Sequence, residues 1–157
     1  MDKVLVIGVG NPYRGDDGVG VAVIDRLRDQ DHPDIEVCEE SGESVALISR
    51  WADRQFVIMV DAVTSGAAPG TIARIECSEG SWQVGPRTGA ASTHGLGVAD
   101  AVELGTVLER LPERLLIFGI EAGAVENGHG LTDPVAAVVD EVVQAIIDEA
   151  EASVTPA

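Results

Sequence analysis

The chain has 157 residues, enough for one domain with a complete hydrophobic core. It carries 27 acidic residues against 10 lysines and arginines, a formal net charge of −17. This charge argues against nucleic acid and anionic membrane surfaces as partners, because both require a cationic footprint. No apolar run approaches the roughly 18 residues that cross a bilayer, and no signal-peptide pattern opens the chain. We expect a soluble, cytoplasmic protein with a single domain over residues 1–150 and a frayed tail over residues 151–157.

The stretch from Val4 to Gly20 combines an apolar strand, a glycine-rich turn and the start of a helix. The strand is apolar throughout, which is typical of a strand buried on both faces. Two adjacent acids, Asp16 and Asp17, lie among the glycines of the turn. Strand, turn and helix form the first half of a βαβ unit, and ligands bind at such strand ends in open α/β sheets.

The turn does not match the loops that bind nucleotides. The dinucleotide fingerprint requires a third glycine where this chain has Tyr13. The phosphate-loop pattern fits Gly10 to Gly15, but Asp16 and Asp17 then replace the lysine and hydroxyl that it needs. Because carboxylates repel a phosphate, this turn suits a cation or a proton transfer better.

Apolar and amphipathic segments alternate along the rest of the chain. Ser44 can cap a helix in which Val45, Ile48 and Ala52 share a face, and Thr132 opens the last helix. We expect further strands over residues 35–38, 55–60, 71–77 (at an edge) and 115–120, and further helices over residues 19–27 and 98–110. This order predicts a three-layer α/β/α sandwich with a mainly parallel five-stranded sheet and one antiparallel edge strand.

Three polar residues are expected at the same edge of that sheet. Asp17 follows the first strand, Asp61 follows the third, and His94 precedes the helix over residues 98–110. The carboxyl ends of parallel strands share one edge, so these side chains can converge there. Two carboxylates and an imidazole suit a divalent metal such as Ni²⁺ or Zn²⁺, or general acid–base catalysis around a water.

Each of these residues also has a purely structural interpretation. Asp17 could cap the first helix, Asp61 could end its strand through a turn hydrogen bond, and His94 could cap its own helix. His129 is a reserve ligand, since it lies in a glycine-containing loop after a strand. Cys38 and Cys77 are far apart and form no metal-spaced pair, which indicates two reduced structural thiols. The G-x-S-x-G and H-E-x-x-H motifs are absent, so no familiar protease motif is present.

At these residues the sequence resembles the hydrogenase maturation endopeptidases, which process the large subunit of nickel–iron hydrogenases. The resemblance covers nearly the whole chain, and the first three motifs in this order make it specific. The motifs are Gly8–Pro12 with Gly15–Gly20, Val60–Ala62 after an apolar strand, His94–Gly97, and, as weaker support, Gly130–Thr132.

The resemblance implies a function beyond what the residues alone indicate. Members of the family remove a C-terminal extension from the large-subunit precursor after nickel has been inserted. Their metal-contacting and catalytic residues fall on Asp17, Asp61 and His94, and the Ni²⁺ arrives with the precursor instead of being bound permanently. Two alternatives stay open: a nickel-binding carrier or checkpoint protein that never cuts, and a peptidase of the same fold that acts on another protein.

Overall fold

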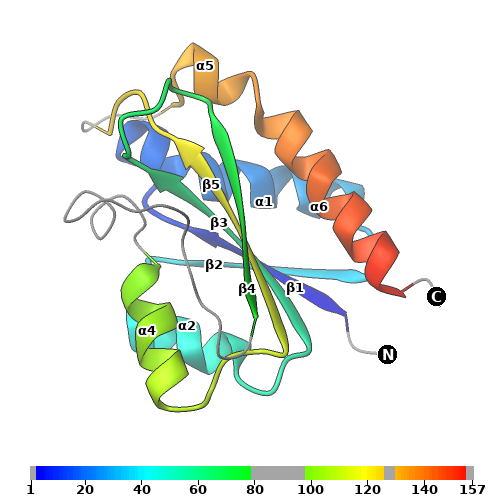
Figure 1. Cartoon of the computed structure of the whole chain (residues 1–157). Coiled ribbons are helices and arrows are strands. Elements are labelled where there is room, and N and C mark those ends of the chain that lie inside the picture. The colour runs from blue at the N-terminus through cyan, green and yellow to red at the C-terminus, as the bar shows by residue number, and fades with distance from the viewer. Residues whose placement is uncertain (1–2, 79–97, 126–129, 155–157) are drawn as a thin grey trace.

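The structure is a computed structural model that describes residues 3–78, 98–125 and 130–154 (Figure 1). Its centre is a five-stranded sheet in the order β2-β1-β3-β5-β4. Strands β2, β1, β3 and β5 are parallel, and the edge strand β4 runs antiparallel to β5. Their bounds are β1 Val4–Val9, β2 Ile35–Glu40, β3 Phe56–Val63, β4 Ile72–Ser78 and β5 Arg114–Glu121.

Helices cover both faces of the sheet, which confirms the predicted α/β/α sandwich with one antiparallel edge strand (Figure 1). Helices α1 and α6 pack on one face, and α2 and α4 pack on the other. A 3₁₀ turn, η1, precedes α1, and a short helix, α5, precedes α6. The bounds are η1 Gly15–Gly18, α1 Val19–Gln30, α2 Ser44–Trp51, α4 Ala99–Val107, α5 Asp133–Ala136 and α6 Val139–Val154. None of the described helices is long and apolar enough to cross a membrane.

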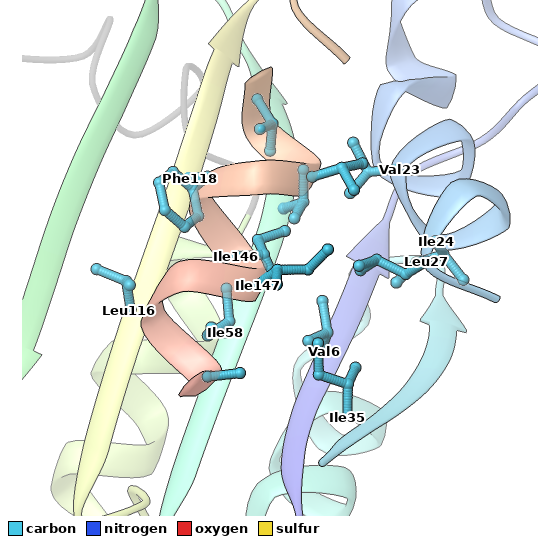
Figure 2. Packing of buried hydrophobic residues seen from close by; sticks show 14 of the residues in the cluster. Val6, Val23, Ile24, Leu27, Ile35, Ile58, Leu116, Phe118, Ile146 and Ile147 are labelled. Carbon is cyan, nitrogen blue, oxygen red and sulfur yellow. The ribbon is translucent and has the colours of Figure 1, made fainter. Parts of the chain in front are cut away.

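The alternation of side chains along the strands divides the core into two clusters. Val6 of β1, Ile58 of β3 and Leu116 of β5 point toward α1 and α6 (Figure 2). Their neighbours in sequence, such as Ile7 and Met59, point toward α2 and α4. Both faces of β1, and most of β3 and β5, are buried, which explains why these three central strands are largely apolar, whereas the edge strand β2 is partly exposed and mixed in polarity. Burial of each such side chain contributes about 1.5–3 kcal/mol.

Helix α2 differs from the sequence prediction at its start and on its buried face. The residue that caps it is Glu43, whose carboxylate accepts hydrogen bonds from the amides of Val45 (3.2 Å) and Ala46 (3.1 Å). Val45 itself is 62% exposed. The buried face is Leu47, Ile48 and Trp51, which follow the i, i+1, i+4 spacing of one helix side.

The last helix is interrupted. The prediction of one continuous helix from Thr132 is wrong, because a turn at residues 137–138 separates α5 from α6. Thr132 occupies the N-cap position of α5 but makes no capping hydrogen bond with its side chain. Helix α6 continues to Val154, beyond residue 150, where the sequence predicted that a tail begins.

Candidate active site

The turn that carries Asp17 packs directly on the carboxyl end of the sheet. A Cβ atom at Gly20 would lie 2.6 Å from the Val60 carbonyl oxygen and 2.7 Å from the Val9 amide nitrogen, so only glycine allows this contact. Gly10 has φ +130°, and a Cβ atom there would lie 2.1 Å from the carbonyl oxygen of Asp17. The glycines of the first motif therefore set the position of the Asp17 backbone against β1 and β3.

Asp17 and Asp61 line the same cleft at this edge of the sheet. The cleft has a volume of about 180 Å³, and its remaining lining comes from the turn before η1, the end of β3 and the segment after β5: Arg14, Ala62, Val63, Thr64, Ala122 and Val125. The structure thus brings together two of the three side chains that the sequence selected. Their catalytic role remains a prediction.

The two carboxylates have different surroundings. Asp17 is partly exposed, and its Oδ2 accepts a hydrogen bond from the amide of Asn11 at 2.9 Å. Asp61 is 3% exposed and lies within β3, where it pairs with Gly119 of β5. Because side chains alternate along a strand, Asp61 points to the same face as Met59, the face that α2 and α4 cover.

The structural interpretations of both acids fit the geometry poorly. The N-cap residue of α1 is Gly18, and no side chain caps this helix. The Asp17 carboxylate instead accepts a hydrogen bond from the amide of Asn11, which precedes it in the chain. Asp61 does not end β3, because the strand continues through Val63. Neither acid is needed at its position to start or stop an element.

The two histidines of interest, His94 and His129, lie outside the described residues. Within residues 3–78, 98–125 and 130–154, no three histidine, cysteine or acidic side chains gather closely enough to hold a metal ion. What the described part of the cleft offers is a pair of carboxylates. Such a pair can contribute ligands to a divalent cation or accept a proton from water.

Asp16, the neighbour of Asp17, is completely buried and was not selected as a site residue by the sequence analysis. Its Oδ2 accepts hydrogen bonds from the amides of Gly123 (2.6 Å) and Ala124 (3.0 Å) and from Oγ1 of Thr132 (2.7 Å). Its Oδ1 accepts one from the amide of Thr132 at 2.7 Å. The Asp16 amide donates to the carbonyl of Ala124 at 2.7 Å. We call Asp16, Gly123, Ala124 and Thr132 the clamp, because one carboxylate holds both ends of the segment between β5 and α5.

The clamp keeps Asp16 ionised. Burial alone would raise the pKa of this carboxyl, but the hydrogen bonds from Thr132, Ala124 and Gly123 stabilise the carboxylate and bring the pKa below its ordinary value. Ala122 and Val125, the neighbours in sequence of the clamp residues Gly123 and Ala124, line the cleft. One wall of the cleft is therefore attached to the turn that carries Asp17.

The cysteines confirm the interpretation as structural thiols. Cys38 lies on β2 and Cys77 on β4, the two opposite edges of the sheet, and both are free. Burial raises the pKa of the Cys77 thiol to about 12 and also raises that of Cys38. Neither thiol is activated as a nucleophile, since nucleophilic attack requires the thiolate.

The family follows from a comparison with known proteins. Residues 21–149 match the family model HycI, described as hydrogenase maturation protease. The chain belongs to the hydrogenase maturation protease family. The resemblance seen in the sequence motifs is therefore correct.

Relatives of this family match the chain over most of its length. The hydrogenase 2 maturation protease of Escherichia coli (strain K12) is 28% identical over 148 residues, which cover 92% of this chain and 88% of the relative. The hydrogenase expression/formation protein HoxM of Azotobacter vinelandii is 26% identical over 149 residues, 93% of this chain and 71% of the relative.

Solved structures of hydrogenase maturation proteases share the fold. The hydrogenase maturating endopeptidase HybD from E. coli has a TM-score of 0.76 at 25% identity and covers 97% of this chain and 94% of its own. The NiFe hydrogenase maturation protease HybD from Thermococcus kodakarensis has a TM-score of 0.71 at 23% identity, and the match covers 94% of this chain and 99% of that structure. At this identity the likeness is one of fold alone.

Glu121, at the end of β5, is a buried acid with 3% exposure. Like Asp16, it was not selected as a site residue from the sequence. Its carboxylate accepts hydrogen bonds from the amide (2.9 Å) and hydroxyl (2.6 Å) of Ser65. Its backbone binds Gly70 and Thr71, each at 2.8 Å. The sequence did carry a signal, because Glu121 follows an apolar strand just as Asp61 does. Its role is to fasten the connection between β3 and β4.

Proposed function

We propose that this protein is an endopeptidase that removes the C-terminal extension of a nickel–iron hydrogenase large-subunit precursor after nickel insertion. The observation that carries the proposal is the cleft shared by Asp17 and Asp61 at the carboxyl end of the parallel sheet. Membership of the hydrogenase maturation protease family supplies the class of substrate. The cleft is open to solvent through the partly exposed Asp17, so a segment of another protein can reach it.

In this proposal Asp17, Asp61 and His94 contact the nickel ion that the precursor carries. The ion is part of the substrate. Three protein ligands leave coordination positions for groups from the precursor. His94 precedes Ala99, the first residue of α4, by five positions in the sequence. Helix α4 covers the face of the sheet toward which Asp61 points.

The proposed chemistry is hydrolysis by a water molecule. A carboxylate of the cleft accepts a proton from the water as its oxygen bonds to the peptide carbonyl carbon, and the same group returns the proton to the leaving nitrogen as the C–N bond breaks. The divalent ion carried by the precursor would orient the water and lower its pKa. Asp17 is the better placed of the two acids for proton transfer, because it is partly exposed while Asp61 is buried. Its single hydrogen bond, from Asn11 to Oδ2, fixes one oxygen of the carboxylate.

The experiment is to incubate the full chain with nickel-loaded and with nickel-free precursor and to measure intact masses. We expect the precursor to lose its C-terminal extension only when nickel is present. A precursor of unchanged mass in both samples, together with tight Ni²⁺ binding by the isolated protein, would instead establish the non-cutting carrier or checkpoint. Equal trimming with and without nickel would contradict recognition of the metal. If only an unrelated protein is cut, the second alternative, a peptidase of the same fold that acts on another protein, holds.

A further inference from the structure

Among the described residues, Arg14 is the one arginine or lysine that lines the cleft beside its two acids. Arg14 is held in the same turn as Asp17: its amide donates to the Asn11 carbonyl and its carbonyl accepts from the Asp17 amide, both at 3.1 Å. Its side chain is exposed. The turn therefore fixes the backbone of Arg14 relative to that of Asp17 and leaves the guanidinium accessible to solvent.

Arg14 has no acidic partner among the described residues, although the protein has 27 acids. Neither Asp17 nor Asp61 approaches its guanidinium within the 4.0 Å of an ion pair, even though all three line one cleft. Most other described arginines do have such partners: Arg26, Arg28, Arg50, Arg54, Arg74 and Arg114. In a chain this acidic, an arginine kept apart from carboxylates in its own cleft leaves its donors available to a substrate.

The chemistry of the guanidinium indicates what it binds. Its planar fork of N–H donors matches the two oxygens of a carboxylate, and charged pairs of this kind are stronger than neutral hydrogen bonds. A bound metal ion would not be its partner, since both are cations. The rest of the protein, with its net charge of −17, repels an acidic peptide. Arg14 would therefore discriminate between peptides by where they carry a negative charge.

We propose that Arg14 is a specificity-determining residue that binds a carboxylate of the substrate segment entering the Asp17–Asp61 cleft. The proposal rests on the proposed function and names the chemistry that the cleft recognises. The carboxylate has two possible sources, an aspartate or glutamate side chain of the extension or the C-terminal carboxylate of the precursor. In both cases Arg14 acts on binding and leaves the hydrolysis step to the acids.

The test measures trimming of nickel-loaded precursor by the full chain and by Arg14→Gln, Arg14→Lys and Arg110→Gln. Arg110 is the matched control, because it too lacks an ion pair among described residues but lines a separate hollow with Asp53 and Glu113, before the starts of β3 and β5. We expect Arg14→Gln to raise KM about ten-fold with kcat nearly unchanged, the loss of one charged hydrogen-bonding pair. Arg14→Lys should lie in between, and Arg110→Gln should match the wild type.

Two altered precursors identify the carboxylate. In one, the acidic residues of the extension are replaced by their amides; in the other, the C-terminus is amidated. The KM difference between wild type and Arg14→Gln should vanish with whichever precursor lacks the recognised carboxylate. An unchanged KM in Arg14→Gln, an equal rise in Arg110→Gln, or a difference that persists with both altered precursors would overturn the inference.

This result is separable from the test of the proposed function. Failure of the wild type to trim any precursor would overturn the proposed function, whereas normal trimming with an unchanged KM in Arg14→Gln would overturn the inference alone. Affinity for the uncut precursor, measured by calorimetry with the same variants, tests Arg14 even where no cut occurs. An equal affinity of wild type and Arg14→Gln would then contradict the role.

Discussion

The clamp and the cleft place two consecutive acids in opposite environments. Asp16 is fully buried and accepts four hydrogen bonds, three of them from backbone amides. Asp17 is partly exposed, and its carboxylate accepts a hydrogen bond from the amide of Asn11 within its own turn. A buried carboxylate is tolerated only when donors surround it, while a carboxylate that binds a substrate must keep an oxygen accessible. These surroundings suit Asp16 to a stabilising role and leave Asp17 accessible for the proposed contact with the substrate.

The largest stability difference should separate Asp16→Ala from Asp17→Ala. Removal of the Asp16 carboxylate leaves the Gly123, Ala124 and Thr132 donors buried without their acceptor, which we expect to cost about 3 kcal/mol. For a chain of this size that corresponds to a fall in Tm of roughly 6–12 °C. Asp17→Ala should cost less than about 1 kcal/mol, since water can replace the lost carboxylate as acceptor for the exposed Asn11 amide. Calorimetry of both variants checks this, and equal losses would remove the distinction between clamp and cleft.

A smaller effect should appear at acid pH. The folded-state pKa of Asp16 lies below its ordinary value, so its carboxylate contributes stability above the pKa of the unfolded chain, about 4. That contribution is lost as the pH falls through the folded-state pKa. Asp16→Asn has no carboxyl group to protonate at this position. The difference in Tm between the wild type and this variant should therefore narrow as the pH is lowered from about 6 to about 2. Glu36 and Glu149 also have lowered pKa values, but both are present in the wild type and in Asp16→Asn, so they do not change the difference in Tm. A constant gap would show that the charge of Asp16 is not what the clamp stabilises.

The smallest expected effect concerns the Thr132 hydroxyl alone. Thr132→Val keeps the shape and the amide donor but removes the 2.7 Å bond from Oγ1 to Asp16, at a cost of about 1 kcal/mol. Thr132→Ser keeps the hydroxyl and is the matched control, with a loss of less than about 0.5 kcal/mol. Urea unfolding of the two variants measures the difference. If Thr132→Val proves no less stable than Thr132→Ser, the hydrogen bond from the Thr132 hydroxyl to Asp16 contributes nothing measurable to stability.

The sequence predicted the sheet and two residues of the cleft for a physical reason. Buried central strands are nearly continuous apolar runs, so they stand out from their surroundings, and polar residues that follow such a strand mark the carboxyl edge. Asp61 was found directly after such a run, and Asp17 in the glycine-rich turn that follows the first strand. Glu121 carries the same signal as Asp61, and consistent use of the rule would have included it as a third acid at that edge.

The clamp could not be predicted from the sequence. Asp16 binds residues more than 100 positions away, and three of its four donors are backbone amides, which every residue except proline possesses. Thr132 looked like a helix cap because threonine is common there, but its hydroxyl binds Asp16 instead. The pairing depends on how β5 and α5 approach η1, and no local pattern records it.

The central claim is that Asp17 and Asp61 act as one site on the peptide bond. The most direct measurement is the trimming rate of nickel-loaded precursor, followed by intact mass, for Asp17→Asn, Asp61→Asn and the double variant. We expect each single variant to lose at least about 100-fold in rate while keeping its fold, and the double variant to be no slower than the slower single one. Normal trimming by the single variants, or losses that multiply in the double variant, would contradict the account.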